Sequence, residues 1–330
     1  MRIKLLFITL LVIISQIKCD DIYNVAIIGG GAAGLAAAKY LARAKLKPLV
    51  IEEDELGGQL NKANIISNWP AVPAMQGREI AELMVKQAKE LGTRFIISQV
   101  RNLSKKGNLF DLELKDGKHI LARSVILASG ARPSKLAIPG EQEYLGKGVA
   151  ICAICDAPLY RNKSVVVIGG DYSALREIEI ISKYTNKITI INKNPELEGP
   201  LMLLNPINEN KNIKVMNNCT AQEILGDGNS VTGVKILNTK INKNEIISAE
   251  GIFISVGWKP SSQLVENKIE LDRKKRVKIY NNTQTSMSGL FAVGDVANNG
   301  DYHQAPVSAN FGYIAGMDAE TYLRQNKSIV

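Results

Sequence analysis

The sequence contains few of the residues that build disulfide scaffolds and metal centres, with four cysteines and two histidines among 330 residues. A small disulfide-stabilised domain would show many more cysteine pairs. A closed zinc site needs four ligands, and the sequence offers only one pair of closely spaced cysteines and no close pair of histidines. The core must therefore form from apolar side chains, which make up 45% of the chain. The length is sufficient for two domains.

Long apolar runs are also rare, and only the first segment contains one. Two basic residues precede an apolar run from Leu5 to Ile14, which is the pattern of a secretory signal peptide and is too short for an ordinary membrane span. We expect a signal peptide over residues 1–19, cleaved near residue 19, and no membrane span after its removal. The protein would then lie in the secretory pathway, outside the cytoplasm. An uncleaved anchor and a lipid-modified Cys19 are the alternatives.

Positive charge is in excess but is not concentrated in any stretch. The net charge is +9, and the lysines and arginines are interspersed with acidic residues. Nucleic-acid-binding proteins gather their basic residues on one face or in one segment. We therefore expect an ordinary solvated surface and no nucleic-acid partner.

A glycine-rich turn follows the first apolar strand after the predicted signal. The strand Val25–Ile28 leads into the spacing G-x-G-x-x-G, formed by Gly29, Gly31 and Gly34. A helix of small residues and a second strand follow, and that strand ends in Glu52. This order is typical of a dinucleotide-binding βαβ unit, in which glycines let the backbone approach a pyrophosphate and the acid binds a ribose. The helix N-terminus would contribute free N–H groups and partial positive charge.

A second unit of the same kind occurs in the middle of the chain. Two apolar strands flank a helix that we predict from Ala174 to Tyr184. The turn before this helix contains Gly169 and Gly170, but Asp171 stands where the middle glycine of the fingerprint is expected.

Two such units and a flavin-type closing segment near the C-terminus predict that one domain is inserted into another. We expect an α/β protein with two Rossmann-like (FAD/NAD(P)-binding) domains. The first domain would comprise residues 20–135 and resume over residues 263–330. The inserted domain would comprise residues 136–262.

The segment CAICD, with Cys152 and Cys155, allows three interpretations. As zinc ligands the two cysteines lack two further donors, and as inert core residues they are a poor choice directly before Asp156. As a redox pair they have the spacing to close a small disulfide loop at low entropic cost. One thiolate can then attack a partner disulfide while the other resolves the mixed intermediate. We favour the redox pair.

The chain resembles the low-molecular-weight thioredoxin reductases of the pyridine nucleotide-disulfide oxidoreductase group over about residues 22–325. The resemblance rests on the order of IIGGGAAG, GGQL, NWP, ASGARP, CAICD, GDVANNGDYHQAPVSA and GMDAETYL. It implies an outer domain that binds FAD and an inserted domain that binds NADPH and carries the redox pair. Electrons would pass from NAD(P)H through FAD to the Cys152–Cys155 disulfide and on to a thioredoxin-like protein. The family also implies a homodimer, and rotation of the inserted domain about Lys135–Gly140 and Trp258–Ser262.

The resemblance also assigns roles to single residues. Cys155 would exchange electrons with the flavin, Cys152 would attack the partner disulfide, and Asp156 would transfer protons. The positions that match the family's FAD contacts are Gly29, Gly31, Gly34, Glu52, Gly58, Gln59, Asn68, Ala128, Gly294, Asp295, Gln304 and Ala305, with His303 where the family usually has arginine. The positions that match its NAD(P)H contacts are Gly169, Gly170, Ala174 and Lys193. No residue is assigned to a metal.

The second nucleotide unit departs from the family in two places. Asp171 brings a carboxylate toward the expected pyrophosphate, and two unit charges ~4 Å apart repel by roughly 4 kcal/mol at an effective dielectric of ~20. After the next strand, Asn192, Lys193 and Asn194 replace a basic cluster that binds the 2′-phosphate, and only Lys193 remains cationic.

These departures leave the electron donor open. In one interpretation NADPH or NADH binds weakly through altered contacts. In the other the nucleotide is lost, and the same body acts as a flavin-dependent dithiol oxidase that passes electrons from a thiol protein or small dithiol to O2, or takes electrons from a non-nicotinamide donor. A non-catalytic flavin-binding sensor is a third class.

Overall fold

The computed structural model describes residues 22–63, 65–298 and 303–326. The predicted signal peptide and Cys19 lie outside these ranges. Within the described part of the chain, no helix is long and apolar enough to cross a membrane.

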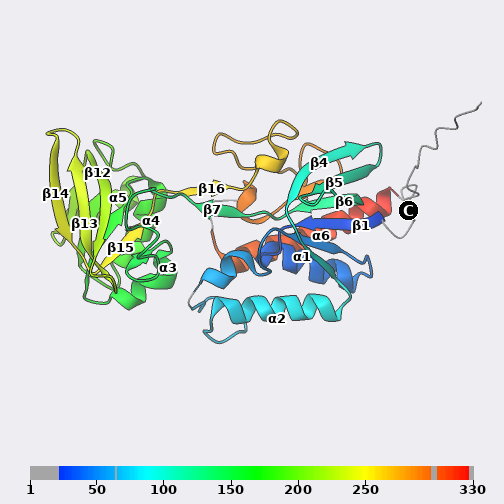
Figure 1. The fold of residues 1–330 in the computed structure, drawn as a ribbon, viewed down its shortest axis with the longest axis horizontal. Helices are drawn as coiled ribbons and strands as arrows, with labels where there is room; N and C mark the ends of the chain where they lie inside the picture. Colours follow the sequence, from blue (N-terminus) through cyan, green and yellow to red (C-terminus); the bar gives the residue numbers. More distant parts are fainter. Residues whose placement is uncertain (1–21, 64, 299–302, 327–330) are drawn as a thin grey trace, which may run out of the picture.

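The described residues form a mixed α/β structure (Figure 1). The α-helices are α1 (Ala32–Arg43), α2 (Gly77–Glu90), α3 (Ala153–Asp156), α4 (Tyr172–Ile181), α5 (Leu201–Glu209) and α6 (Ala305–Gln325). The strands are β1 (Ile22–Ile28), β2 (Leu49–Glu52), β3 (Arg94–Ile97), β4 (Val100–Lys106), β5 (Leu109–Leu114), β6 (His119–Leu127), β7 (Ala131–Pro133), β8 (Val149–Ala150), β9 (Ser164–Ile168), β10 (Lys187–Ile191), β11 (Ile213–Met216), β12 (Cys219–Gly226), β13 (Val231–Asn238), β14 (Lys243–Ser248), β15 (Gly251–Ile254), β16 (Trp258–Pro260) and β17 (Leu290–Ala292). Short 3-10 helices are η2 (Gly58–Lys62), η3 (Ala157–Tyr160), η4 (Gln263–Val265) and η5 (Gly294–Val296).

The largest sheet joins the first and last parts of the chain. Its strand order is β3-β2-β1-β6-β5-β4, and β17 also pairs with β6. Strands β1, β2, β3, β6 and β17 run parallel, whereas β4 and β5 form an antiparallel extension. Because β17 lies beside β6, the segment after β17 is brought next to the glycine turn that follows β1.

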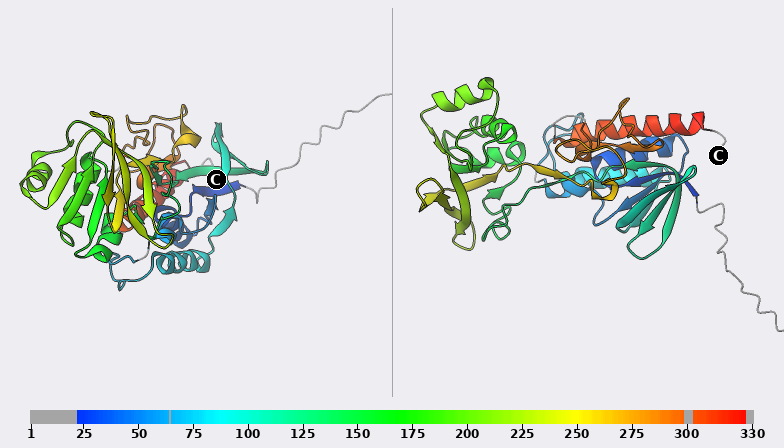
Figure 2. Two further views of the ribbon diagram at one scale, coloured as in Figure 1. Left: turned by 60° about the vertical axis from the view of Figure 1, so that its left-hand side comes forward. Right: turned by 90° about the horizontal axis from the view of Figure 1, so that it is seen from above.

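The middle part of the chain forms two further sheets. One is parallel, with the order β11-β10-β9-β15-β8, and the other is the antiparallel sheet β12-β13-β14. Strands β7 and β16 pair antiparallel where the chain passes between the large sheet and these two sheets (Figures 1 and 2). The domain limits at residues 135 and 262 remain predictions, and they fall close to this pair of strands.

Alternation along β1 explains how the large sheet is buried on both faces. Val25 and Ile27 belong to one apolar cluster with α1 and α6, while Ala26 and Ile28 belong to the cluster on the opposite face. Helices α1 and α6 approach closely because their facing residues are small. A Cβ at Gly312 would overlap the carbonyl oxygen of Ala33. This packing fixes the start of α1, where the first glycine turn lies.

The two βαβ units confirm the Rossmann-like α/β fold class expected from the sequence. Helix α1 is the helix of small residues expected after the first glycine turn, but α4 begins at Tyr172, two residues before the predicted start, and ends at Ile181 rather than Tyr184. The earlier start has a local cause, because the side chain of Asp171 caps the helix. This contact is described below.

Candidate redox and dinucleotide site

The first glycine turn leaves the N-terminus of α1 open. Gly29 has a φ of +107°, and its N–H donates to the carbonyl oxygen of Ile51 at 2.8 Å. Gly31 precedes α1 in an extended conformation, and no side chain of the described residues caps the helix there. A Cβ built on Gly31 would meet no described atom within 4 Å. The free N–H groups of α1 therefore face open space, as a bound pyrophosphate requires.

The other glycines of this turn are needed by the protein itself. A Cβ at Gly29 would overlap the carbonyl oxygen of Ala128, and a Cβ at Gly34 would overlap that of Gly29. The backbone of β1, α1 and the end of β6 thus meets without side chains in between. Gly58 (φ +54°) lies against Gly31, since a Cβ on Gly58 would be 3.2 Å from the Cα of Gly31. The start of η2 therefore packs against this turn.

Glu52 lies at the end of β2, beside the same turn. Its Oε2 accepts a hydrogen bond from the N–H of Gly30 at 2.6 Å, and its Oε1 accepts one from the N–H of Asp54 at 3.0 Å. The carboxylate is thus oriented by backbone donors at the carboxyl edge of the sheet. An acid in this place can accept the hydroxyl hydrogens of a ribose.

The segment after β17 brings a second group of candidate residues to the turn. Gly294 has a φ of +71°, and a Cβ there would lie 3.2 Å from the Cβ of Ala33 in α1. The neighbouring Asp295 accepts a hydrogen bond from the hydroxyl of Ser308 at 3.4 Å. Asp295 is therefore held between β17 and α6 near the start of α1.

Two further candidates, which are far apart in sequence, are in direct contact. The Nδ2 of Asn68 donates to Oε1 of Gln304 at 2.8 Å. The Nε2 of Gln59 donates to the carbonyl oxygen of Ala131 at 3.4 Å. Ala305 is the first residue of α6 and directly follows Gln304. These contacts join η2 to the segment after β6, and the segment around Asn68 to the start of α6.

His303 is positioned on Trp258, which belongs to β16. The two rings stack with centroids 5.3 Å apart and an interplanar angle of 17°. The Nδ1 of His303 is buried and has no hydrogen-bond partner among the described residues, while Oδ2 of Asp295 lies 3.6 Å away. A buried polar atom without a partner requires a ligand or water to satisfy it. The open helix N-terminus, Glu52 and this orphaned nitrogen together fit a flavin dinucleotide.

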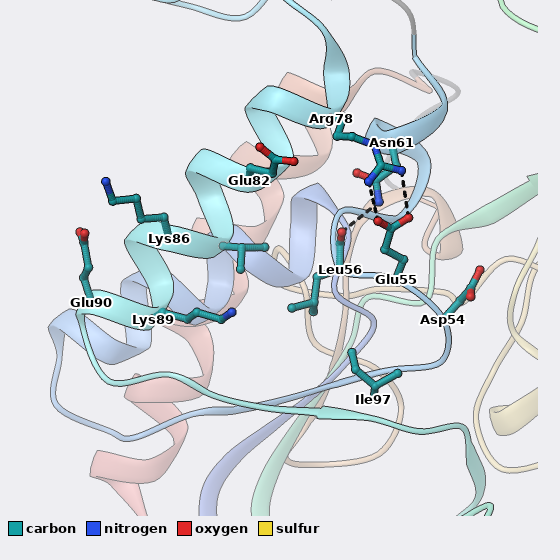
Figure 3. Close-up of a pocket in the computed structure, with 11 residues that line it drawn as sticks. Asp54, Glu55, Leu56, Asn61, Arg78, Glu82, Lys86, Lys89, Glu90 and Ile97 are labelled. Carbon is teal, nitrogen blue, oxygen red and sulfur yellow. Dashed lines mark hydrogen bonds and ion pairs between the residues drawn. The ribbon is translucent and has the colours of Figure 1, made fainter.

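Two pockets flank the segment that follows β2. One, of about 530 Å³, lies between α2 and residues 54–56, where Arg78 makes a double hydrogen bond to Glu55 (2.6 and 3.2 Å) (Figure 3). None of the predicted residues lines it. The other, of about 940 Å³, opens beyond the carboxyl ends of β2 and β3, beside Glu52.

The larger pocket contains residues that sequence reasoning missed. Gln99 and Arg132 both donate to Glu53, each at 3.0 Å, and all three side chains line this pocket. A dinucleotide held by Glu52 would extend its adenosine end in this direction. The signal available in the sequence was their position, just after β3 and β6, whose carboxyl ends share the edge with β2.

The redox pair is a closed disulfide in this structure. Cys152 and Cys155 are bonded, with their Cα atoms 5.3 Å apart. Cys152 caps α3, since its sulfur accepts from the N–H of Cys155 at 3.3 Å. Both residues are half-buried. Figure 1 shows that α3 lies on the side of the middle part of the chain that is nearer to the large sheet. The sulfur of Cys152 is thus held by a backbone donor at the start of α3.

Asp156 closes the same short helix and stands half-buried next to the pair. Its N–H donates to the carbonyl oxygen of Cys152 at 3.0 Å. Its charge contributes to the raised pKa of Tyr160, after the larger effect of burial on that phenol. An acid directly after the pair is in a position to exchange protons with a leaving thiolate.

The second glycine turn has a backbone similar to the first, but a side chain caps the helix that follows it. Gly169 has a φ of +144°, and its N–H donates to the carbonyl oxygen of Ile191 at 3.0 Å. Asp171 is the N-cap of α4, and its Oδ1 accepts a hydrogen bond from the N–H of Ala174 at 3.0 Å. The carboxylate therefore turns into the helix N-terminus. A pyrophosphate can take this place only if the side chain leaves.

The side chain that follows β10 in the second unit is also hydrogen-bonded within the protein. Asn192 follows β10 as Glu52 ends β2, and it is buried. Its amide donates to the carbonyl oxygens of Asn194 and Glu196 and to Oδ1 of Asn217, at 3.2, 2.8 and 2.9 Å. These bonds fold the loop back onto the turn. Lys193 remains exposed on its outer side.

A partly buried acid, Glu177, lies near the second turn. The Oε2 of Glu177, on α4, accepts a short hydrogen bond from the hydroxyl of Ser255, which follows β15. Burial raises the pKa of Glu177 to about 7, and the negative charge of Asp171 also raises it, whereas Ser255 and His303 lower it. Sequence reasoning missed this residue because only burial distinguishes it from the exposed Glu179 of the same helix.

We expect Glu177→Gln to stabilise the protein at pH 8 and to change little at pH 4.5. An unfolded glutamate loses its proton near pH 4.5, whereas the folded one keeps it to about pH 7. Between these values the folded state binds more protons, so wild-type stability falls as pH rises, by about 3 kcal/mol at most. Thermal unfolding midpoints at both pH values test this. Glu179→Gln is the matched control, and parallel pH profiles for wild type and Glu177→Gln would contradict the assignment.

Comparisons with known proteins agree with this geometry. The model of the family "Pyridine nucleotide-disulphide oxidoreductase" matches residues 23–312. The thioredoxin reductase of Coxiella burnetii is 35% identical over 91% of this chain and 96% of its own length. The mitochondrial thioredoxin reductase 2 of Saccharomyces cerevisiae is 36% identical over 91% of each chain. The crystal structure of thioredoxin reductase from Streptococcus pyogenes superposes with a TM-score of 0.83, at 30% identity, covering 92% of this chain and 99% of that one. With its open dinucleotide turn and its closed cysteine pair, the chain belongs to the pyridine nucleotide-disulphide oxidoreductase family.

Proposed function

We propose that this chain is an FAD-dependent thiol-disulfide oxidoreductase of the thioredoxin reductase type. It passes electrons from NAD(P)H through FAD to the Cys152–Cys155 disulfide and on to a thioredoxin-like protein. The observation that carries the proposal is the closed Cys152–Cys155 disulfide in a chain whose first glycine turn is open to a dinucleotide. The relatives named thioredoxin reductase, which match more than nine-tenths of the chain, support the substrate class.

The residues of the first domain hold the cofactor. The N–H groups of α1 would bind the pyrophosphate, Glu52 would bind the ribose, and Asp295 and His303 would supply further polar groups. When bound, FAD accepts an electron pair as hydride and delivers it to a disulfide. Glycine at position 31 leaves the pyrophosphate position free of a side chain.

The residues of the redox pair carry the electrons to the partner. Reduction breaks the Cys152–Cys155 bond and leaves two thiols. Cys152, whose sulfur faces the N–H groups of α3, attacks a sulfur of the partner disulfide and expels a thiolate. Cys155 then attacks Cys152 in the mixed disulfide, which restores the intramolecular bond and releases the reduced partner. Asp156 provides the proton exchange for these thiolates.

We also propose the compartment, the oligomeric state and the interdomain motion of the protein. The apolar run Leu5–Ile14 supports a cleaved signal peptide and a location outside the cytoplasm. The likeness to the thioredoxin reductases supports a homodimer and rotation of residues 136–262 about Lys135–Gly140 and Trp258–Ser262. The pairing of β7 with β16 beside these segments supplies a narrow connection for such a rotation.

Anaerobic mixing tests the proposed function. We expect NADPH to bleach the visible absorbance of the bound flavin, and an added oxidised thioredoxin to restore it within the same mixture. NADH is tested in parallel, because Lys193 is the one cation of the loop 192–198. No response to either nucleotide, together with dithiol-driven oxygen uptake in a separate aerobic assay, would instead establish a dithiol oxidase.

A further inference from the structure

The two glycine turns of this chain follow nearly the same backbone course but differ in the residue that precedes the helix. Gly29 and Gly169 both have positive φ, and both donate to the carbonyl of the last or next-to-last residue of the following strand, at 2.8 and 3.0 Å. The residues before the helices also agree, with φ and ψ of −79° and −169° at Gly31 and of −88° and 177° at Asp171. The turns therefore differ in side chains rather than in course.

The difference lies at the N-cap residue, which is Gly31 before α1 and Asp171 before α4. A Cβ at Gly31 would enter space that no described atom occupies within 4 Å. At the equivalent Asp171, the carboxylate lies at the N-terminus of a ten-residue helix and accepts the N–H of Ala174 at 3.0 Å. A carboxylate satisfies the same donors and the same helix charge that a phosphate would satisfy.

Other acidic residues near the second turn add to the negative charge that a pyrophosphate would meet there. Glu177 lies beneath the turn and is close enough for the charge of Asp171 to raise its pKa. Glu198 lies above it, since its N–H donates to the carbonyl oxygen of Gly170 at 2.7 Å and its Oε1 accepts from Asn194 at 2.7 Å. Arg176, on the first turns of α4, is paired with Glu179 at 2.7 Å. The described surroundings of the turn are thus predominantly acidic.

We propose that Asp171 sets the affinity of the hydride-donor site for its dinucleotide, and that its carboxylate must be displaced before a dinucleotide pyrophosphate can bind to α4. This inference rests on the proposed function. The first domain holds its dinucleotide on an uncapped helix, whereas the second holds a removable internal anion. The affinity for NADPH and NADH is therefore set by the competition between Asp171 and the pyrophosphate for the N–H groups of α4.

Equilibrium binding of NADP+ to the oxidised, flavin-loaded protein tests the proposal without turnover. We expect Asp171→Gly to lower the Kd for NADP+ by about tenfold or more, because both the competing cap and the repulsive charge are removed. Asp171→Asn retains a capping side chain without the charge, so its Kd should fall between those of wild type and Asp171→Gly. Glu179→Gln removes an equal charge from the same helix and should leave the Kd unchanged.

The remaining outcomes separate this proposal from the proposed function. An Asp171→Gly protein that is folded and flavin-loaded, but binds NADP+ no more tightly than wild type, would overturn the role of Asp171. A Glu179→Gln protein with the same gain would also overturn it, because the effect would then come from net charge. Anaerobic bleaching by NADPH is read on wild type alone, so the proposed function can stand when the role of Asp171 fails. Circular dichroism of each variant verifies the fold.

Discussion

Cys155→Ser should lower the steady-state rate of thioredoxin reduction by roughly a thousandfold or more. The remaining Cys152 can attack a partner disulfide, but no second sulfur resolves the product. Because Cys152 caps α3 and lies at the helix N-terminus, it stays reactive in this variant. The variant should therefore accumulate a covalent complex with the partner.

Nonreducing electrophoresis after mixing Cys155→Ser with an oxidised thioredoxin detects this complex. Cys152→Ser should lose the activity equally and form no complex, since the attacking sulfur is absent. The matched control is Cys219→Ser, because Cys219 is buried in β12 and belongs to neither site. Wild-type turnover in Cys155→Ser would end the assignment of the redox pair.

Gly31→Asp should yield a folded protein without flavin. The substitution copies Asp171 into the first turn, whose backbone has nearly the same φ and ψ. The new carboxylate would cap α1, which tends to stabilise the helix, and would occupy the place of the pyrophosphate. A repulsion of roughly 4 kcal/mol between charges ~4 Å apart corresponds to a loss of affinity of several hundredfold.

The ratio of visible to ultraviolet absorbance of the purified protein measures this loss, and far-ultraviolet circular dichroism verifies the fold. Gly31→Ala is the control for size, since its methyl group meets no described protein atom within 4 Å and adds no charge. It should keep more flavin than Gly31→Asp. Full flavin content in Gly31→Asp would show that the cofactor does not use the N-terminus of α1.

Together with Asp171→Gly, this experiment forms a reciprocal exchange. One variant brings a carboxylate to an open turn, and the other removes it from a capped turn of the same course. If the N-cap residue decides occupancy, the two variants must act in opposite directions on their respective nucleotides. A change in the same direction in both would point to a general effect on the fold.

The sequence predicted the site best where the chemistry is local. The spacing of Gly29, Gly31 and Gly34 requires a particular turn, because larger residues at Gly29 and Gly34 would overlap neighbouring backbone. The spacing of Cys152 and Cys155 allows a short disulfide loop, which the structure contains. These patterns depend on residues within one turn or one strand-turn-helix unit, so they can be identified without knowledge of the remainder of the chain.

The sequence alone determined that the chain contains two strand-turn-helix units with glycine turns, a cysteine pair with redox spacing and a carboxylate at position 171. The tertiary structure alone decided where that carboxylate points, that Asn192 is committed to internal bonds and that the partly buried Glu177 is hydrogen-bonded to Ser255. The physical reason is that a side chain's direction, burial and charge environment depend on segments distant in sequence. Composition and spacing do not specify which of those segments will meet.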